Sequence, residues 1–436
     1  MTSDHASAVP VPLPGADGVA GRMERLTRSD SAVLWASSLT VASRLGAKLA
    51  LLLFLIALPR LLTLGEFAAY SYLLALAVTF SLLGETGVAL AAGREVSSGR
   101  FTPAQALRAS LPVVTVGGLA AAVLLSAFVA LDSGPGAGLA AAAAAALFVV
   151  ANTYFNLAAT LLRSTGRVGL EAAVQSLGMA AFVATGIVLA LAGFGVAAIL
   201  AALALKEAVS AAIAHRALRA DIDLRRCGPT GRWRTLLRIG VHLALASTAF
   251  AVITRAPLVL LGNLAPAAQV AWFSAPLRLA DAALVVAATA GFALLPTLTH
   301  LLASDRPRAT RLMSRLLWIG GAGGLALGAL GVLFAEDIVR VVFGAAFTPA
   351  AACARILLAG LPAYVLLGLA WYFLTACDGE RDLARVAAAG CVASLLLSAV
   401  LIPVGADVGA AAAYVASVAL LALGYVAMLA RRLGRA

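Results

Sequence analysis

Residues 31–59, SAVLWASSLTVASRLGAKLALLLFLIALP, form an apolar stretch long enough to cross a membrane, yet this stretch holds Arg44 and Lys48 near its middle. A charge at the bilayer centre costs about 2.5–3.5 kcal/mol on insertion scales, so such side chains usually face a polar interior. Ser37 and Thr40 precede the two cations at helical spacing, which places all four on one stripe of an α-helix. This helix is therefore predicted to have a lipid-facing side and a cationic side.

The composition predicts a polytopic membrane protein. Of 436 residues, 62% are hydrophobic and 12% are charged, whereas soluble domains average about 25% charged residues. The net charge is +12, but the cations are spread among short loops, which argues against nucleic acid as a partner. The four cysteines lack the spacing of a metal site, and we expect no metal and no cofactor apart from a coupling ion, a proton or sodium.

Twelve apolar runs separated by charged residues, Pro or Gly predict an all-α protein with twelve transmembrane helices. The one longer outer connection, 335–349, predicts a short interfacial helix. The twelve runs lie at 31–59, 67–92, 108–131, 139–162, 168–192, 195–214, 238–262, 269–299, 312–334, 350–376, 384–403 and 409–430.

The distribution of arginines supports this number of spans. Loops assigned to the inside hold 24 of the 32 Lys and Arg residues, the outside holds Arg60 and Arg340, and six cations lie within spans. An excess of Lys and Arg marks the cytoplasmic side. Because one missed span would reverse every later loop, the asymmetry predicts twelve helices in the cytoplasmic (inner) membrane with both termini in the cytoplasm.

Weak internal repeats predict two similar halves. EFAAYSYLLAL (66–76) and QVAWFSAPLRL (269–279) open the second and eighth spans at an offset of 203, and LLRSTGR (161–167) and LTACDGE (374–380) follow at an offset of 213. Both halves begin inside, so the repeats are parallel. The predicted units are a disordered cytoplasmic tail (1–30), an N-lobe with helices 1–6 (31–215), a basic cytoplasmic linker (216–237) and a C-lobe with helices 7–12 (238–436).

The chain also resembles a known family. The segments LPRLLTLGEFAAYS (58–71), LGETGVALAAGRE (83–95) and VFGAAFTPA (342–350), together with the opening from Ser31 to Arg44, resemble polysaccharide-transport (Wzx-like) flippases. These belong to the multidrug/oligosaccharidyl-lipid/polysaccharide (MOP) exporter superfamily. The resemblance implies two six-helix lobes around a central cavity, alternating access, and an undecaprenyl-diphosphate-linked glycan as cargo. It also implies membrane lipids and polysaccharide polymerases or glycosyltransferases as partners.

Charged residues within the predicted spans are the candidates for a substrate-binding site. Arg44 and Lys48, with Arg255 and Arg278 from the other lobe, are predicted to bind the diphosphate of the cargo. The alternatives are pairing of Arg44 and Lys48 with acids on other helices, pairing of Arg278 with Asp281 three residues away, and structural hydrogen bonding by Arg255, which has no acid nearby in sequence.

Further polar residues within spans suggest sugar contacts and ion coupling. Asn152 and Asn156 form a polar stripe that contacts either sugar or a neighbouring helix. Asp281, Glu85 and Glu171 are candidates for coupling, with Asp281 first because it lies deepest in its span. Lys206 and Glu207 are adjacent, so each is expected to find its own partner.

Several other functions compete with glycan-lipid export. A cationic cavity disfavours a multidrug exporter of organic cations. A lipid II flippase of the same superfamily is an alternative, although that branch usually has two more helices. From a different class, a polysaccharide polymerase or glycosyltransferase is expected to need a sizeable outer loop, and the predicted outer loops are short. The sequence contains no catalytic constellation, so a transporter rather than an enzyme is predicted.

Overall fold

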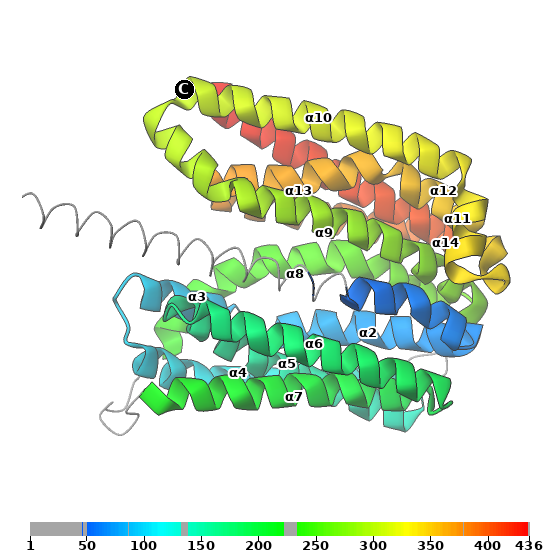
Figure 1. The fold of residues 1–436 in the computed structure, drawn as a ribbon, viewed down its shortest axis with the longest axis horizontal. Coiled ribbons are helices and arrows are strands. Elements are labelled where there is room, and N and C mark those ends of the chain that lie inside the picture. The colour runs from blue at the N-terminus through cyan, green and yellow to red at the C-terminus, as the bar shows by residue number, and fades with distance from the viewer. Residues whose placement is uncertain are drawn as a thin grey trace, which may run out of the picture.

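The computed structural model describes residues 46, 50–85, 87–131, 138–221, 233–377 and 379–434, and these ranges fold as a helical bundle (Figure 1). Arg44, Lys48, the tail 1–30 and the middle of the linker lie outside the described residues. A helix at Ala50–Leu61 comes first. It is followed by α2 (Leu64–Glu85), α3 (Val88–Ser97), α4 (Pro103–Leu131), α5 (Leu139–Ser164), α6 (Val168–Leu191), α7 (Gly195–Asp221), α8 (Trp233–Leu264), α9 (Ala267–Ser304), α10 (Arg306–Leu333), α11 (Ala335–Phe343), the 3₁₀-helix η2 (Ala345–Ala350), α12 (Ala351–Ala359), α13 (Leu361–Ala376) and α14 (Glu380–Gly434).

Each predicted span has a helical counterpart. Among the described residues, eight helices are long and apolar enough to cross a membrane, and the bent pair Ala345–Ala359 and Leu361–Ala376 makes a ninth. One of the eight, α14, covers two predicted spans. Two shorter apolar helices, Ala50–Leu61 and Thr248–Leu264, match the first and seventh spans. The protein is therefore a multi-pass membrane protein of the predicted fold class, and α11 confirms the predicted short helix.

Two breaks modify the sequence-based spans, and a third falls where a connection is predicted. The second span, predicted as one helix over 67–92, divides into α2 and α3 at Gly87, whose φ of 65° is left-handed. The tenth bends by 43° between α12 and α13, where Pro362 lacks the N–H that would continue the helix. The predicted connection between spans 11 and 12 corresponds to Ala406 within α14, whose φ of 44° and ψ of −116° are not helical.

The described helices form two halves. In Figure 1, α2 to α7 make the lower half, α9 to α14 make the upper half, and α8 runs between them. We call α2–α7 the N-terminal half and α8–α14 the C-terminal half. Helix α7 extends to Asp221 and α8 begins at Trp233, so helices occupy both ends of the predicted linker.

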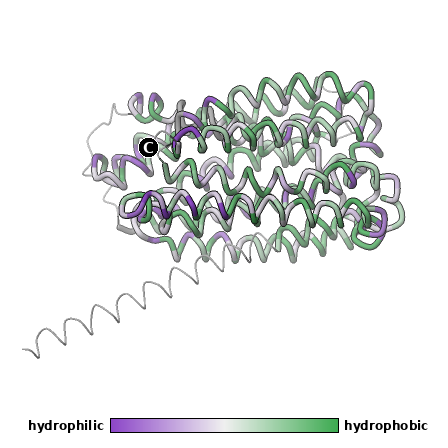
Figure 2. The backbone as a smooth tube through the Cα atoms, turned by 90° about the horizontal axis from the view of Figure 1, so that it is seen from above, coloured by the Kyte–Doolittle hydropathy of each residue, from purple (hydrophilic) through white to green (hydrophobic). Residues whose placement is uncertain are grey.

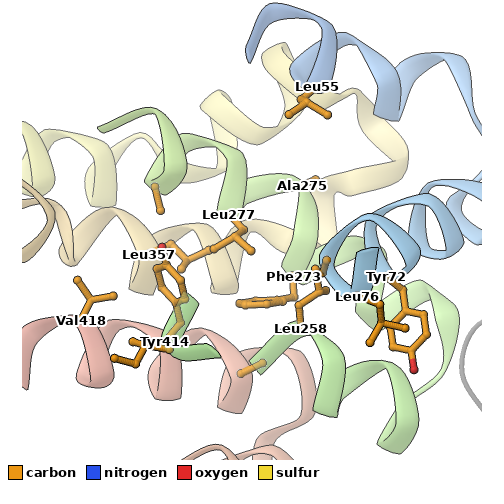
Figure 3. Close-up of a cluster of buried hydrophobic side chains, with 14 of the residues drawn as sticks. Leu55, Tyr72, Leu76, Leu258, Phe273, Ala275, Leu277, Leu357, Tyr414 and Val418 are labelled. Atoms are coloured by element: carbon orange, nitrogen blue, oxygen red, sulfur yellow. The ribbon is translucent and has the colours of Figure 1, made fainter. Parts of the chain in front are cut away.

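An apolar core joins the halves. Figure 3 shows Leu76 of α2, Leu258 of α8 and Phe273 of α9 within this core, and all three are buried. Hydrophobic residues cover most of each helix and hydrophilic residues gather near the ends of the bundle (Figure 2). The helices therefore bury one apolar face against each other and leave another for lipid.

One group of contacts between the halves lies where α2 and α12 begin, the end predicted to lie outside. Phe67 of α2 packs edge-on against Phe347 of η2, with ring centroids 5.8 Å apart. The Arg60 guanidinium donates a hydrogen bond to the carbonyl oxygen of Val341. At the opposite end, α9 and α10 diverge from the N-terminal half (Figure 1), whereas the start of α8 packs against α3 and α4, where Leu236 is buried. The structure thus joins α11 and η2 to the N-terminal half at the predicted outer end, and the start of α8 at the opposite end.

Candidate substrate and coupling sites

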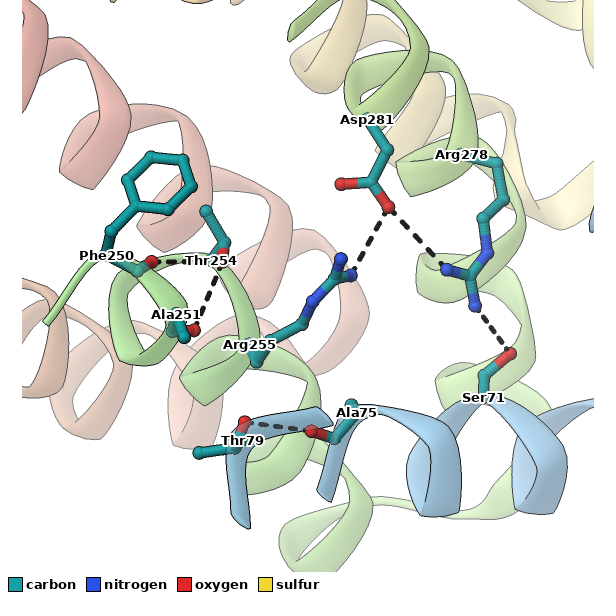
Figure 4. A network of polar contacts seen from close by, with 9 residues as sticks. All are labelled: Ser71, Ala75, Thr79, Phe250, Ala251, Thr254, Arg255, Arg278 and Asp281. Carbon is teal, nitrogen blue, oxygen red and sulfur yellow. Dashed lines mark hydrogen bonds and ion pairs between the residues drawn. The ribbon is translucent and has the colours of Figure 1, made fainter. Parts of the chain in front are cut away.

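A charged cluster of Arg255, Asp281 and Arg278 lies between the two halves (Figure 4). Arg255 Nη1 on α8 lies 3.3 Å from Asp281 Oδ2 on α9, and Arg278 Nη1 lies 3.6 Å from the same oxygen. Arg278 Nη2 donates a 3.3 Å hydrogen bond to Ser71 Oγ on α2, so the cluster bridges both halves. Two guanidinium groups share one carboxylate, which leaves the cluster one positive charge in excess.

Burial makes this excess charge costly. The side chain of Arg278 is 4% exposed, whereas those of Arg255 and Asp281 are 23% and 21% exposed. Within the described residues, Arg278 Nε has no hydrogen-bond partner. A buried charge without full compensation is expensive and usually serves a function in a membrane protein. Arg255 and Asp281 are accessible enough to meet a ligand, while Arg278 holds the carboxylate in place.

The helix that carries Arg255, α8, lacks one backbone hydrogen bond next to this residue. Pro257 lies two residues after Arg255 and has no N–H to bond the carbonyl of Ile253. Ser394 Oγ of α14 donates to that carbonyl at 3.4 Å, which satisfies the freed acceptor. A polar helix–helix contact thus supports the position of Arg255.

Three buried tyrosines surround the charged cluster. Tyr70 lies on α2, Tyr364 on α13 and Tyr414 on α14, and none of their hydroxyls has a hydrogen-bond partner in the described residues. Tyr414 is close enough to Arg255 and Asp281 to interact electrostatically, and the Tyr364 and Tyr414 rings are 5.9 Å apart. Unpaired buried hydroxyls next to a charge offer donors to a polar ligand or to water.

The polar stripe on α5 contacts α2. Asn152 Nδ2 donates to Ser81 Oγ at 2.6 Å, and Asn156 Nδ2 donates to Glu85 Oε2 at 3.3 Å. Both asparagines therefore contact a neighbouring helix, which is one of the two expectations. Their contact with sugar stays a prediction. The structure therefore places Glu85, which is 9% exposed, beside a neutral amide.

The three candidate coupling acids have different surroundings. Asp281 lies between two arginines, and Glu171 Oε1 accepts from Arg163 Nη1 at 2.9 Å. The hydrogen-bond donor to Glu85 is the amide of Asn156. Glu85 also lies two residues before the break at Gly87, and broken helices often mark ion sites in transporters.

Two pairings differ from the sequence-based expectation. Arg255, which has no acid nearby in sequence, pairs with Asp281, because the fold brings this residue to it from another helix. The pairing of Arg278 with Asp281 is present, as the helical spacing suggests. Lys206 and Glu207 do not find separate partners: Lys206 Nζ lies 2.7 Å from Glu207 Oε1, and both side chains are buried. The flexible lysine stem overcomes the angular separation of adjacent helical residues, because burial leaves each charge in need of the other.

Arg44 and Lys48, the first candidates from the sequence, lie outside the described residues. The structure places the helix that follows them against the N-terminal half, where Phe54 packs on Phe182 with ring centroids 5.2 Å apart. The described residues contain no group of three His, Cys, Asp or Glu side chains that could hold a metal ion.

A helical membrane bundle with two halves, broken helices and a buried charge cluster between the halves is typical of a secondary transporter. A family model described as polysaccharide biosynthesis protein matches residues 34–302, more than half of the chain. The chain therefore belongs to this family. No curated protein sequence matches the chain significantly.

Several solved structures share the fold, one of them a MATE family transporter of the MOP superfamily. The chain is similar to an inward-facing multidrug resistance MATE family transporter, with a TM-score of 0.70, 15% identity, and coverage of 91% of this chain and 98% of that chain. The chain is also similar to the lipid II flippase MurJ in an inward closed conformation, with a TM-score of 0.69 and 12% identity. The match covers 91% of this chain and 87% of that chain. A eukaryotic MATE transporter matches with a TM-score of 0.62 and 11% identity, over 94% of this chain and 98% of that chain. These solved structures are transporters and a flippase, and they confirm the predicted fold class.

Proposed function

We propose that this protein moves an anionic polyprenyl-diphosphate-linked oligosaccharide across the cytoplasmic membrane for cell-surface polysaccharide synthesis. The chain's family supports a role in polysaccharide biosynthesis. The observation that supports the cargo is the net positive charge of the Arg255–Asp281–Arg278 cluster between the two halves. Its cargo is an undecaprenyl-diphosphate-linked glycan, and polymerases or glycosyltransferases are its partner proteins.

The chemistry of the cluster suits a diphosphate. Arginine gives two parallel hydrogen bonds to phosphate oxygens, and such charge-assisted bonds are stronger than neutral ones. In our proposal Arg255 turns from Asp281 toward the incoming diphosphate while Arg278 remains paired with the carboxylate. Arg44 and Lys48, on the first span, add positive charge from the N-lobe (31–215), opposite the C-lobe (238–436). The shared carboxylate weakens the attraction, which allows the cargo to leave.

The state of the molecule supports loading from the cytoplasm. The contacts of Phe67 with Phe347 and of Arg60 with Val341 lie at the predicted outer end. In alternating access these contacts separate when the inner ends of the lobes approach each other. The polyprenyl tail stays in the bilayer throughout, while the diphosphate and the sugars cross between the lobes.

Ion coupling is assigned first to Glu85 rather than to Asp281. Asp281 already forms ion pairs with Arg255 and Arg278, so its carboxylate serves to hold these two guanidinium groups. Glu85, buried beside the amide of Asn156, is in the more suitable environment. We propose that binding of a proton or a sodium ion at Glu85 changes the geometry at the Gly87 break.

The proposal is tested in proteoliposomes that contain the purified protein and a fluorescent undecaprenyl-diphosphate-linked oligosaccharide. We expect the label to reach the opposite leaflet, without any lengthening of the glycan. A product of greater length without movement would identify a polymerase instead. Movement of lipid II at a higher rate than of the oligosaccharide would favour the lipid II flippase alternative, and movement of an organic cation would favour the multidrug alternative.

A further inference from the structure

The N-terminal half contains a groove of about 470 Å³ between α4, α5 and α7. This volume is within the range of about 300–1,000 Å³ for small-molecule sites. The groove has two chemically different parts, an apolar wall and a basic end. The apolar wall includes Leu111, Leu147, Val150, Ala211 and Ala212, and the basic end is formed by His215 and Arg219.

The position of the groove identifies its surroundings as lipid. Leu147 is 54% exposed, which is unfavourable in water and favourable in a bilayer. Figure 1 shows α7 at the edge of the N-terminal half, on the side away from α10 and α13. Arg219 is two residues from the end of α7, on the predicted cytoplasmic side. The groove thus begins at the inner membrane surface and runs toward the bilayer centre.

The polar groups of the wall are already satisfied. The hydroxyls of Tyr154 and Thr115 lie 2.5 Å apart, and Thr115 Oγ1 also donates to the Leu111 carbonyl at 2.7 Å. The wall therefore offers hydrocarbon contact rather than free donors. At the basic end, by contrast, Arg219 is exposed and lies close enough to His215 to interact electrostatically.

We propose that this groove binds an anionic phospholipid of the inner leaflet, with one acyl chain along the apolar wall and the phosphate at Arg219 and His215. Charge complementarity supports this occupant, because a guanidinium at the interface attracts a headgroup whose negative charge is not offset by an amine. The polyprenyl tail of the cargo is disfavoured, because the groove faces away from the Arg255–Asp281–Arg278 cluster. This site goes beyond transport and does not depend on the identity of the cargo.

The test is native mass spectrometry of the full chain purified with dioleoylphosphatidylglycerol or dioleoylphosphatidylcholine as the probe. The phosphatidylglycerol form should be retained more strongly, and Arg219→Gln should lower its retention about fivefold, the effect of about 1 kcal/mol for one arginine near an anionic surface. Arg216→Gln is the matched control, because Arg216 is exposed on the same turn and does not line the groove. Ala212→Phe, which fills the groove, should lower retention of both lipids.

Three results would overturn the proposal. Equal retention of the two phospholipids, or equal effects of Arg219→Gln and Arg216→Gln, would exclude a specific anionic site. Displacement of phosphatidylglycerol by undecaprenyl phosphate, lost in Ala212→Phe, would assign the groove to the prenyl chain. Thermal unfolding of each variant shows whether it is folded. Since the assay measures lipid retention without transport, its outcome is separate from that of the proposed flippase activity.

Discussion

At the scale of residues, the sequence indicates which charges are unusual but not how they pair. Arg278 and Asp281 are three residues apart on one helix, and their contact follows from helical spacing. The contact of Arg255 with Asp281 joins α8 to α9, so its residues are 26 positions apart and depend on tertiary packing. Ser71, which accepts from Arg278, has no sequence signal at all beyond being a polar residue in an apolar span.

Substitution of Arg255 tests the excess charge directly. In Arg255→Gln, Arg278 and Asp281 remain as a neutral pair, so the protein should fold and reach normal abundance. Loss of one charge-assisted hydrogen bond of about 1.5–3 kcal/mol predicts a decrease in transport of at least about tenfold. The control is Arg340→Gln on the exposed surface of α11, which should transport normally. Normal transport by Arg255→Gln would exclude Arg255 from the binding site.

Substitution of Glu85 tests the coupling site. In Glu85→Gln, the amide oxygen still accepts from Asn156, so the contact between α2 and α5 is kept while the charge is removed. Transport should continue but lose its dependence on an ion gradient, measured in proteoliposomes with and without imposed proton and sodium gradients. The control Glu171→Gln loses its pairing with Arg163 and should remain coupled. Retained coupling in Glu85→Gln, or its loss in Asp281→Asn alone, would return the assignment to Asp281.

At the scale of elements, apolar runs locate the helices well because each span must satisfy its own backbone in lipid. The breaks are harder to locate. Gly87 follows Glu85 within an apolar run, and nothing in the hydropathy distinguishes a left-handed glycine from a helical one. The kink at Ala406, by contrast, lies within the connection predicted between the spans 384–403 and 409–430. At Gly87 the apolar run predicts one continuous helix, and packing in the folded protein decides where it stops.

The break between α2 and α3 predicts a specific cost for alanine. Gly87→Ala places a Cβ in the left-handed region and should lower stability by about 1–2 kcal/mol. The lower unfolding temperature would be measured in detergent. Gly65→Ala is the matched control: its added Cβ would meet open space on α2, and its stability should be unchanged or higher. Equal unfolding temperatures for the two variants would contradict the left-handed conformation of Gly87.

At the scale of the whole molecule, the arginine asymmetry predicts topology and the repeats predict two halves, since both depend only on the order of spans. Which ends of the halves meet is not encoded by hydropathy. The contact of Phe67 with Phe347 joins residues from different halves, and a change of state would remove it without changing any span. Sequence therefore predicts the architecture, whereas the conformation depends on small differences in packing between states.

Topology and conformation are tested together by cysteine chemistry in a cysteine-free background. Ala265→Cys should react with an impermeant thiol reagent from outside, and Thr230→Cys should react only after the membrane is opened. Phe67→Cys with Phe347→Cys, joined by a short bifunctional thiol reagent, should stop transport, because the outer ends could no longer separate. Labelling of Thr230→Cys in sealed cells would overturn the twelve-span topology, and undiminished transport after crosslinking would contradict the role of the outer contact.

The central claim is that positive charge between the halves recognises the diphosphate of the cargo. The most direct measurement compares, in the same proteoliposomes, the initial transport rates of one fluorescent oligosaccharide linked to the polyprenyl chain through a diphosphate or through an uncharged linker of equal length. We predict that the diphosphate form moves at least about tenfold faster, and that Arg255→Gln removes most of this difference. Equal rates for the two linkers in the unaltered protein would contradict the claim.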